Sequence, residues 1–227
     1  MVNLDKYSSI FIANWKLNGN LSFLNKYCEN LKINSNNCTI ICPPPIYLKS
    51  LKINKEGLFC GAQDISRFNE GAFTGELSAS MLKDNNIHFC IIGHSERRQY
   101  FNETNENIKI KGENLINQNI IPVICIGETL EQKKENQTEN ILCKQISECI
   151  PDLANNKNAI IAYEPVWAIG TGLTPTFNEI NMVHGIIKNF DSKLSHFKVI
   201  YGGSVKSNNS KEIKALNHVD GCLIGGA

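Results

Sequence analysis

Residues 121–126 have the sequence Ile-Pro-Val-Ile-Cys-Ile, an apolar run that no charged side chain interrupts. Seven other short runs are similarly apolar and recur at fairly regular intervals along the chain. Apolar residues at nearly every position, as opposed to every second position, are typical of a strand that is covered on both faces. The eight predicted strands span residues 10–14, 39–43, 58–62, 89–93, 121–126, 159–164, 198–202 and 221–225.

The segments between the predicted strands have the spacing of amphipathic helices, with apolar residues every three or four positions. Strands that alternate with helices predict βα units and a parallel sheet. Periodicity does not distinguish a closed barrel from an open, doubly wound sheet, but eight units favour closure. We therefore expect an α/β fold, a parallel (β/α)8 barrel. The apolar helix stripes are Leu21, Leu24, Tyr27, Cys28 and Leu31; Ile141, Ile146, Cys149 and Ile150; and Ile180, Val183, Ile186, Ile187 and Phe190.

Length, composition and charge fit one globular domain over residues 1–227, because no linker or low-complexity segment divides the chain. The 23 basic and 22 acidic side chains leave a net charge of +1, so no broad basic surface suggests nucleic acid as a partner. The N-terminal residues lack the apolar segment of a signal peptide, and no apolar run is long enough to span a membrane. We therefore expect a cytoplasmic protein.

The nine cysteines raise the alternatives of metal binding and disulfide bonding. Their number is odd, and no Cys-x-x-Cys pair occurs. Five of them lie in predicted strands, where a thiol behaves as a small hydrophobic side chain. We expect structural packing and no metal site; the five are Cys42, Cys60, Cys90, Cys125 and Cys222.

Two strand ends carry polar side chains suited to chemistry, because barrels of this type place reactive groups at the carboxyl ends of their strands. The first strand ends in residues 14–16, Asn-Trp-Lys, and strand alternation places Asn14 and Lys16 on the same side. A lysine there can hold an anion; the alternative is an exposed lysine that begins a loop. His94 leaves the fourth strand within residues 93–98, Gly-His-Ser-Glu-Arg-Arg. It is a candidate catalytic group, with a structural histidine as the alternative.

The sixth predicted strand ends in Glu164, and an unusually apolar loop follows it. Loops are normally polar, so residues 166–169, Val-Trp-Ala-Ile, suggest a segment that covers something. Pro165 precedes this loop, and Gly170 and Gly172 follow it as candidate hinges. We expect a lid that closes over a site. The alternative is a loop packed permanently on the surface.

Glycines follow the seventh and eighth predicted strands, at residues 202–203 and 225–226. A glycine lets backbone N–H groups approach an oxyanion closely, and several together can form a phosphate site. A single pair is weak evidence, because tight turns also use glycine. Two clusters, after strands seven and eight, match the usual position of a phosphate site in such barrels.

These segments together resemble the motifs of the triosephosphate isomerase family. Residues 14–16, 93–98, 163–172, 201–205 and 221–227 resemble that family's motifs in the same order and at similar spacing. Residues 69–76 resemble its dimer-forming third loop. The resemblance runs from residue 10 to the last residue. It implies a TIM barrel, a homodimer, and interconversion of D-glyceraldehyde 3-phosphate and dihydroxyacetone phosphate in glycolysis and gluconeogenesis.

The resemblance also implies roles for individual residues, with no cofactor and no metal. Glu164 is the expected general base, and His94, as a neutral imidazole, is expected to polarise the substrate carbonyl. Lys16 and Asn14 are expected to contact the substrate oxygens and stabilise an enediol or enediolate intermediate, with Glu96 as their polar neighbour. The main-chain N–H groups expected to hold the phosphate are those of Gly170, Ser204, Gly225 and Gly226.

Alternatives and departures from the family pattern remain at this point. Another sugar-phosphate isomerase is possible, whereas an aldolase would need a lysine inside a middle strand, and strands three to six contain none. A catalytically silent barrel that binds phosphate ligands or acts as a scaffold is the alternative from another class. The lid's trailing hinge is Leu173-Thr174-Pro175 where the family commonly has Lys-x-Ala.

A second departure is that no segment for an eighth helix follows the last predicted strand, so the C-terminal helix is apparently missing. Each large apolar side chain that loses its cover forfeits about 1.5–3 kcal/mol, and a whole domain has only about 5–15 kcal/mol of stability. We expect that the natural chain continues past Ala227 or that this form is marginally stable.

Overall fold

The computed structural model describes residues 2–169, 171 and 173–225, and its centre is a closed barrel of parallel strands. Each strand pairs with the next along the chain, and β1 also pairs with β8, so the sheet closes. Closure confirms the predicted (β/α)8 barrel and rules out the open, doubly wound sheet. The strands are β1 (Ser9–Asn14), β2 (Asn37–Cys42), β3 (Leu58–Ala62), β4 (Phe89–Ile92), β5 (Ile121–Ile126), β6 (Ile160–Tyr163), β7 (Lys198–Tyr201) and β8 (Gly221–Ile224).

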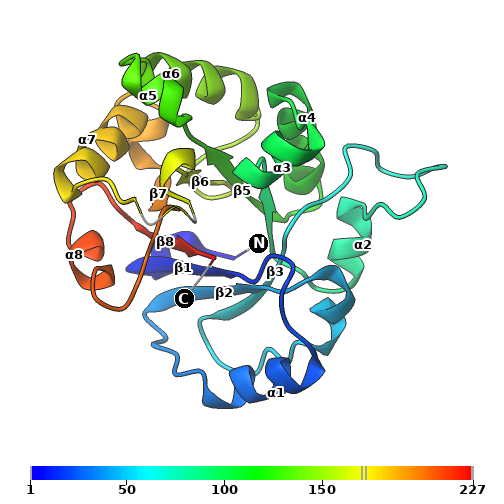
Figure 1. Cartoon of the computed structure of the whole chain (residues 1–227). Coiled ribbons are helices and arrows are strands. Elements are labelled where there is room, and N and C mark those ends of the chain that lie inside the picture. The colour runs from blue at the N-terminus through cyan, green and yellow to red at the C-terminus, as the bar shows by residue number, and fades with distance from the viewer. Residues whose placement is uncertain (1, 170, 172, 226–227) are drawn as a thin grey trace.

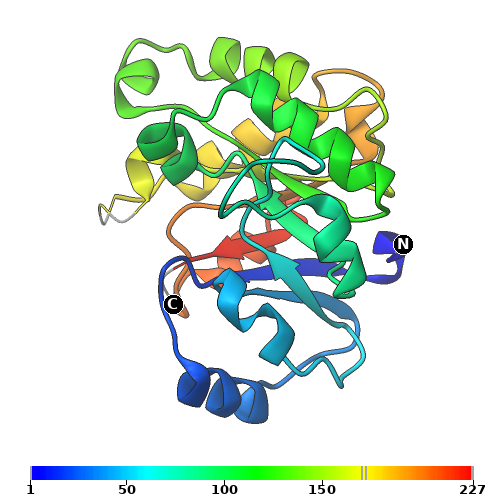
Figure 2. The same ribbon diagram turned by 90° about the vertical axis from the view of Figure 1, so that its right-hand side faces the viewer.

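Helices surround the strands, as Figures 1 and 2 show from two directions. The α-helices are α1 (Leu21–Asn30), α2 (Ala79–Asp84), α3 (Ser95–Phe101), α4 (Asn105–Asn117), α5 (Leu130–Lys134), α6 (Thr138–Cys149), α7 (Phe177–Lys188) and α8 (Ser210–Lys214). Short 3-10 helices occur at η1 (Leu4–Lys6), η2 (Pro45–Ser50), η3 (Val166–Ala168) and η4 (Leu194–His196). Within the described residues no helix meets the length and hydropathy that a membrane crossing requires.

Side chains cap the N-termini of six of the eight α-helices in the described part of the chain, and the cap of α7 holds the segment that follows the apolar loop. The hydroxyl of Thr176 accepts the N–H of Glu179 at 3.2 Å, and the carboxylate of Glu179 accepts the N–H of Thr176 at 2.7 Å. Such a reciprocal pair satisfies two backbone donors that the first helical turn leaves open. Glu179 also pairs with Lys133 of α5 at 2.9 Å. Lys133 and the Thr176 N–H together lower the pKa of Glu179 to about 2.

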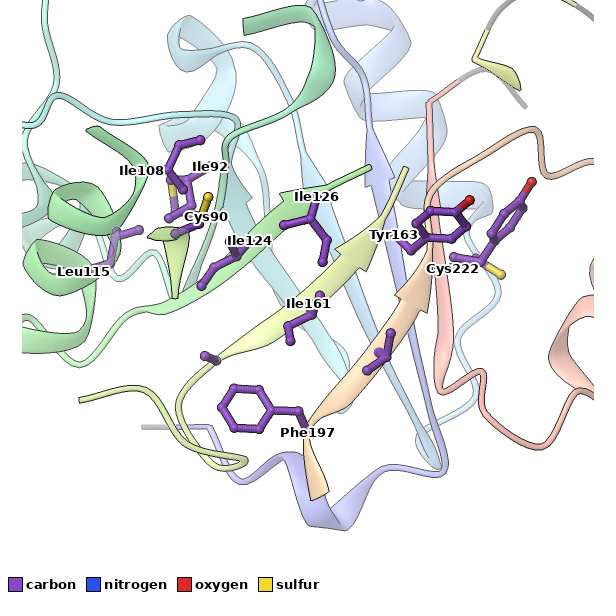
Figure 3. Close-up of a cluster of buried hydrophobic side chains, with 14 of the residues drawn as sticks. Cys90, Ile92, Ile108, Leu115, Ile124, Ile126, Ile161, Tyr163, Phe197 and Cys222 are labelled. Carbon is purple, nitrogen blue, oxygen red and sulfur yellow. The ribbon is translucent and has the colours of Figure 1, made fainter. Parts of the chain in front are cut away.

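The core has two layers because successive strand residues point to opposite faces. The inner layer fills the barrel with side chains such as Ile12, Phe89 and Leu223. The outer layer lies between the strands and the helices, and Figure 3 shows part of it. There Ile108 of α4 lies beside Ile92 of β4, and both side chains are fully buried. Strands covered on both faces explain why the sequence shows continuous apolar runs.

Two residues of the predicted apolar stripes are solvent-exposed, contrary to expectation. Leu21 is the first residue of α1, where its side chain is 55% exposed. Phe190 is 37% exposed because α7 ends at Lys188, so Phe190 does not continue the helical face. Helical spacing predicts which side chains point in the same direction, but it does not predict where the helix ends or which part of the protein packs against that face.

The cysteines pack as the sequence predicted: all nine are free thiols, and the five in the predicted strands are buried. Burial raises the pKa of Cys60 and of Cys222 to about 12, because a thiolate is poorly solvated in an apolar layer. The protonated thiol, which behaves as a small apolar side chain, is thus the favoured form in this layer. In the part of the chain that the structure describes, no three His, Cys, Asp or Glu side chains are grouped to hold a metal ion.

On the outside of β1 and β8 the apolar side chains are less covered than elsewhere on the barrel. Phe11, Ala13 and Ile224 are only partly buried, whereas Ile92 on β4 and Ile124 on β5 are completely buried. The ammonium group of Lys214 lies 5.8 Å from the centre of the Phe11 ring. Among the described residues, β8 is the last helix or strand of the chain.

Candidate active site

A cavity of about 300 Å³ opens at the carboxyl ends of the strands. Its volume is at the lower end of the roughly 300–1,000 Å³ of small-molecule sites. The cavity brings together six of the eight residues predicted to act in catalysis or substrate binding, and these six come from five strand ends. Gly170 and Gly226, the other two predicted phosphate-binding residues, lie outside the described residues. The six are Asn14, Lys16, His94, Glu164, Ser204 and Gly225.

Glu164 and His94 are in direct contact, and both side chains are almost completely buried. Oε1 of Glu164 lies 3.0 Å from Nε2 of His94, and Oε2 accepts the N–H of Ser95 at 2.9 Å. Nδ1 of His94 accepts the N–H of Glu96 at 3.3 Å. An acceptor at Nδ1 places the proton of a neutral imidazole on Nε2. The ring therefore directs an N–H donor toward the cavity and Glu164.

A glycine makes room for the Glu164 side chain. A Cβ added to Gly202, at the end of β7, would come within 2.9 Å of Cγ of Glu164. The carboxyl-bearing side chain thus passes directly over the glycine backbone of the next strand. Any larger residue at this position would push Glu164 out of its present place.

Lys16 is held in an unusual backbone conformation at the end of β1. Its φ is +52°, in the left-handed region that non-glycine residues seldom occupy. Oδ1 of Asn14 accepts the Lys16 N–H at 3.0 Å, and Nε2 of Gln63 donates to the Lys16 carbonyl at 2.9 Å. Gln63 also donates to the carbonyl of Cys42 at 2.9 Å, which ties this turn to β2. Strain that the surroundings maintain in this way is typical of functional positions.

The ammonium group of Lys16 lies between a carboxylate and the last strand. Nζ is 2.6 Å from Oε1 of Glu96. A Cβ added to Gly225 would come within 2.7 Å of Cε of Lys16, so the lysine passes over the backbone at the end of β8. Trp15 points the opposite way, as strand alternation predicted, and its ring packs on Phe23 at 4.9 Å between centroids.

The loop after β7 presents Ser204 to the cavity. Its hydroxyl donates to the carbonyl of Ala168 at 2.8 Å, which links this loop to the apolar loop after β6. The side chain of Asn209 holds the turn from both sides: Nδ2 donates to the Ser204 carbonyl at 3.1 Å, and Oδ1 accepts the Lys206 N–H at 2.8 Å. Val205 between them is buried and anchors the turn.

The apolar loop after Glu164 begins with η3, and a buried carboxylate anchors it. Oε1 of Glu128 accepts Nε1–H of Trp167 at 2.8 Å and the hydroxyl of Tyr163 at 3.1 Å. Glu128 is 1% exposed, and this burial raises its pKa above the usual value. Lys133 lies 3.7 Å above the Trp167 ring. Ile169, near the other end of the loop, lines the cavity.

Sequence analysis missed Glu128 and Gln63. Both follow strands directly, Glu128 two residues after β5 and Gln63 one residue after β3. Applying the strand-end rule to all eight strands would have included them. Their roles come from hydrogen bonds between distant parts of the chain. Glu128 binds Trp167, which is 39 positions away, and Gln63 binds Lys16, which is 47 positions away, so no local sequence pattern contains either pair.

The two arginines after His94 have different partners. Nε of Arg97 lies 2.7 Å from Asp64 after β3, an ion pair with a neighbouring loop. Arg98 instead donates to backbone carbonyls, to Gly93 at 2.9 Å and to Cys125 at 3.0 Å. These bonds join the ends of β4 and β5 below the cavity.

The cavity therefore combines a carboxylate, an imidazole N–H and an ammonium group, and the loop of Ser204 also lines it. A carboxylate can accept a proton, and the N–H and ammonium donors can stabilise an oxyanion. Gly202 and Gly203 after β7 and Gly225 after β8 also line the cavity, and a glycine backbone can approach an oxyanion closely.

Comparison with known proteins identifies the family to which this chain is similar. A family model described as triosephosphate isomerase matches residues 9–227. A triosephosphate isomerase of Francisella philomiragia is 38% identical over 231 residues, which cover 96% of this chain and 91% of that protein. One from Rhizobium meliloti is 39% identical, covering 95% and 89%, and one from Dictyoglomus thermophilum is 40% identical, covering 96% and 93%. The chain belongs to the triosephosphate isomerase family.

Proposed function

We propose that this chain interconverts D-glyceraldehyde 3-phosphate and dihydroxyacetone phosphate through an enediol or enediolate. The observation that carries the proposal is the convergence of Glu164, His94 and Lys16 on one cavity, beside the loop of Ser204. The family relatives named above are isomerases of this kind. The site needs no cofactor for the reaction, because both hydrogen shifts are proton transfers.

Glu164 is the general base of the proposed reaction. Its carboxylate removes a proton from the carbon next to the carbonyl, and the electron pair moves into the new C=C bond and onto the carbonyl oxygen. The same carboxylate then returns the proton to the neighbouring carbon. Its present hydrogen bonds to Ser95 and His94 must yield when substrate enters, because one carboxylate oxygen has to reach both carbons. General base catalysis of this type contributes roughly 10²–10⁴-fold.

His94 supplies the proton donor for the substrate oxygens. The N–H of Glu96 on Nδ1 keeps the imidazole proton on Nε2, and that proton faces the cavity. A neutral imidazole is a weak acid, and its acidity is closer to that of an enediol than an imidazolium's would be. It therefore exchanges a proton with either oxygen without trapping the intermediate.

Lys16 and Asn14 stabilise the negative oxygen of the intermediate. The ammonium group is paired with Glu96, whose side chain is 40% exposed, so a substrate oxyanion can compete for it. Asn14 also holds the Lys16 backbone through its Oδ1. Positioned charge of this kind acts most strongly where water is excluded.

The phosphate group lies against the loops after β7 and β8. Backbone N–H groups of Ser204 and Gly225, together with those of Gly170 and Gly226, are the proposed ligands. Val166, Trp167 and Ile169 belong to the lid that excludes water, which prevents loss of phosphate from the intermediate. Ile169 already lines the cavity, and Trp167 donates a hydrogen bond to Glu128.

We also propose that the chain forms one domain and acts as a homodimer in the cytoplasm, in glycolysis and gluconeogenesis. Exposed apolar side chains occur on the segments that follow β1, β2, β3 and β4 at the carboxyl end of the barrel, and two of them, Leu17 and Ile46, are 96% and 80% exposed. Such side chains on one rim are typical of an interface. The others are Phe73, Tyr100 and Phe101.

Sedimentation equilibrium tests the dimer. We expect a dimer for the wild type and a monomer for Leu17→Glu, because a charge would be buried at the interface. Leu153→Glu is the matched control, since Leu153 is 58% exposed but lies between α6 and β6, away from that rim. A wild-type monomer at all concentrations would contradict the proposal.

The isomerase activity is tested by following the conversion of glyceraldehyde 3-phosphate to dihydroxyacetone phosphate. Glu164→Gln keeps the side-chain shape but removes the base, and we expect turnover to fall about 10²–10⁴-fold. Near-normal turnover in this variant would remove Glu164 from the mechanism. An inactive wild-type protein that still binds phosphate would instead favour the catalytically silent binding or scaffold protein.

A further inference from the structure

Apart from Lys206, the charged groups of the described residues that line the cavity supply no unpaired positive charge. The ammonium of Lys16 is paired with the carboxylate of Glu96 at 2.6 Å. Glu164, when it acts as a base, adds a negative charge on the cavity wall. A phosphate monoester carries close to two negative charges at neutral pH. These groups alone therefore repel a phosphate monoester.

Lys206 is the other cationic residue that lines the cavity among the described residues. Its side chain is exposed, and within the described part of the chain no carboxylate lies within 4.0 Å of its ammonium group. It follows Ser204 by two positions, so it stands at the phosphate side of the cavity and not at the side of Glu164 and His94.

The backbone that carries Lys206 is fixed. Oδ1 of Asn209 accepts the Lys206 N–H at 2.8 Å, and Nδ2 of the same side chain donates to the Ser204 carbonyl at 3.1 Å. Val205 is buried between the two residues. The ammonium group is therefore tethered to the same rigid turn that presents the Ser204 amide.

We infer that Lys206 attracts the phosphate group of the substrate and favours its binding beside Ser204. This inference rests on the proposed function for the identity of the substrate, but it applies to any phosphate monoester that enters the cavity. Lys206 acts on the non-reacting end of the ligand, so it contributes to association and binding and not to the proton transfers.

The expected size of the effect follows from Coulomb's law. In water a unit charge about 8 Å from a dianion changes its binding by about fivefold. The Debye length is about 10 Å at 0.1 M salt and about 3 Å at 1 M, so the effect should disappear as salt is added. A direct contact would give a larger change.

The test compares Lys206→Met with Lys211→Met. Both variants lower the net charge of +1 by one unit, and Lys211 is an exposed residue of α8 that does not line the cavity. At low ionic strength we expect Lys206→Met to lower kcat/KM about three- to tenfold through KM, with kcat nearly unchanged. The loss should shrink at ~0.5 M salt, because salt screens exposed charges. Lys206→Arg should restore most of it, and Lys211→Met should change kcat/KM less than twofold.

Titration calorimetry with inorganic phosphate supplies a readout that does not depend on turnover. Weaker phosphate binding by Lys206→Met than by Lys211→Met supports the inference, whether or not the wild type is an active isomerase. If the wild type shows this difference in binding but no isomerase activity, only the proposed function fails. Equal phosphate binding and equal kcat/KM in the two variants would overturn the inference and leave the proposed function standing. A loss that is independent of salt and not rescued by Lys206→Arg would also overturn it, because it would indicate damage to the turn.

Discussion

Nε2 of His94 and Oε1 of Glu164 lie 3.0 Å apart, and the two side chains come from the ends of β4 and β6. Strand β5 separates them in the barrel, so the closed sheet fixes the distance between the two groups. The imidazole is oriented from its other side by the Glu96 N–H, and the carboxylate by the Ser95 N–H. Two successive backbone N–H groups of α3 thus fix the orientation of the proposed acid and base relative to each other.

Replacing His94 should separate proton donation from substrate binding. We expect His94→Gln to lower kcat about 10²–10³-fold, the usual loss for one donor to a developing oxyanion, with a smaller change in KM. Steady-state kinetics measures both constants. His88→Gln is the control, because His88 lies before β4 at the opposite end of that strand and should have little effect. A His94→Gln variant with wild-type kcat would show that the carbonyl is polarised by another group.

The hydrogen bond between Trp167 and Glu128 should stabilise the loop that we propose as the lid. Glu128 is buried, so removing the Trp167 donor leaves its carboxylate with the Tyr163 hydroxyl alone on Oε1. We expect Trp167→Phe to lower the free energy of unfolding by about 1.5–3 kcal/mol, because the bond is to a charged group.

A double-mutant cycle with Glu128→Gln isolates this bond from the other effects of each change. Urea unfolding of the two single variants and the double variant should give a coupling energy of about 1 kcal/mol or more. Additive losses would mean that the bond contributes nothing and that packing of the Trp167 ring accounts for the effect.

The barrel could be predicted from the sequence because its determinants are local. A run such as residues 121–126 is buried on both faces, and for this reason all of its residues are apolar. The position of Glu164 was equally predictable, since it follows such a run and precedes an apolar loop. Local patterns could not show what the loop's Trp167 binds, because Glu128 is 39 residues away in the chain.

Side-chain burial on the helices was less predictable for a related reason. Spacing placed Leu21 with Leu24 on one face, yet only Leu24 is buried. Trp15, at the end of β1, packs on Phe23 and Tyr27 of α1. The face of α1 that is covered therefore depends on the neighbouring strand end as well as on the spacing within the helix. The ion pairs of Asp64 likewise join segments that have no common sequence pattern.

Lys111 should be important for stability because it neutralises buried carboxylates. Its ammonium group contacts Glu103 and lies 2.8 Å from Oδ1 of Asp64. Burial raises the pKa of Asp64 to about 6, although Lys111 opposes this shift. We expect Lys111→Met to lower the free energy of unfolding by about 3–5 kcal/mol at pH 7.5, because among the described residues Arg97 would then be the one cation left beside two largely buried carboxylates.

Lys109→Met is the matched control for this prediction. Lys109 is on the same helix and pairs with Asp152, whose side chain is 87% exposed, so its loss should cost less than about 1 kcal/mol. The deficit of Lys111→Met should shrink near pH 5, where Asp64 is protonated in the folded state. Urea unfolding at both pH values measures this. Equal losses in the two lysine variants would show that the buried cluster contributes no more than a surface pair.

His184 should make the fold sensitive to acid. It is completely buried on α7, with Nδ1 3.3 Å from the His218 carbonyl and the rings of Tyr163 and Tyr201 around it. Burial lowers the pKa of His184 to about 3, because its charged form would lose hydration there. The unfolded chain binds this proton near pH 6.5, whereas the folded protein does not until about pH 3. Stability is therefore lost as the pH falls between these values, by about 1.4 kcal/mol per pH unit.

His184→Gln tests this because its amide can still donate to the His218 carbonyl but does not titrate. We expect the difference in the free energy of unfolding between pH 7 and pH 5 to be about 2 kcal/mol smaller in this variant than in the wild type. His196→Gln is the control, since His196 is exposed in η4 and should keep the wild-type difference. Urea unfolding at both pH values provides the comparison. If His184→Gln retains the full wild-type difference, the acid sensitivity arises from other groups and His184 titrates alike in both states.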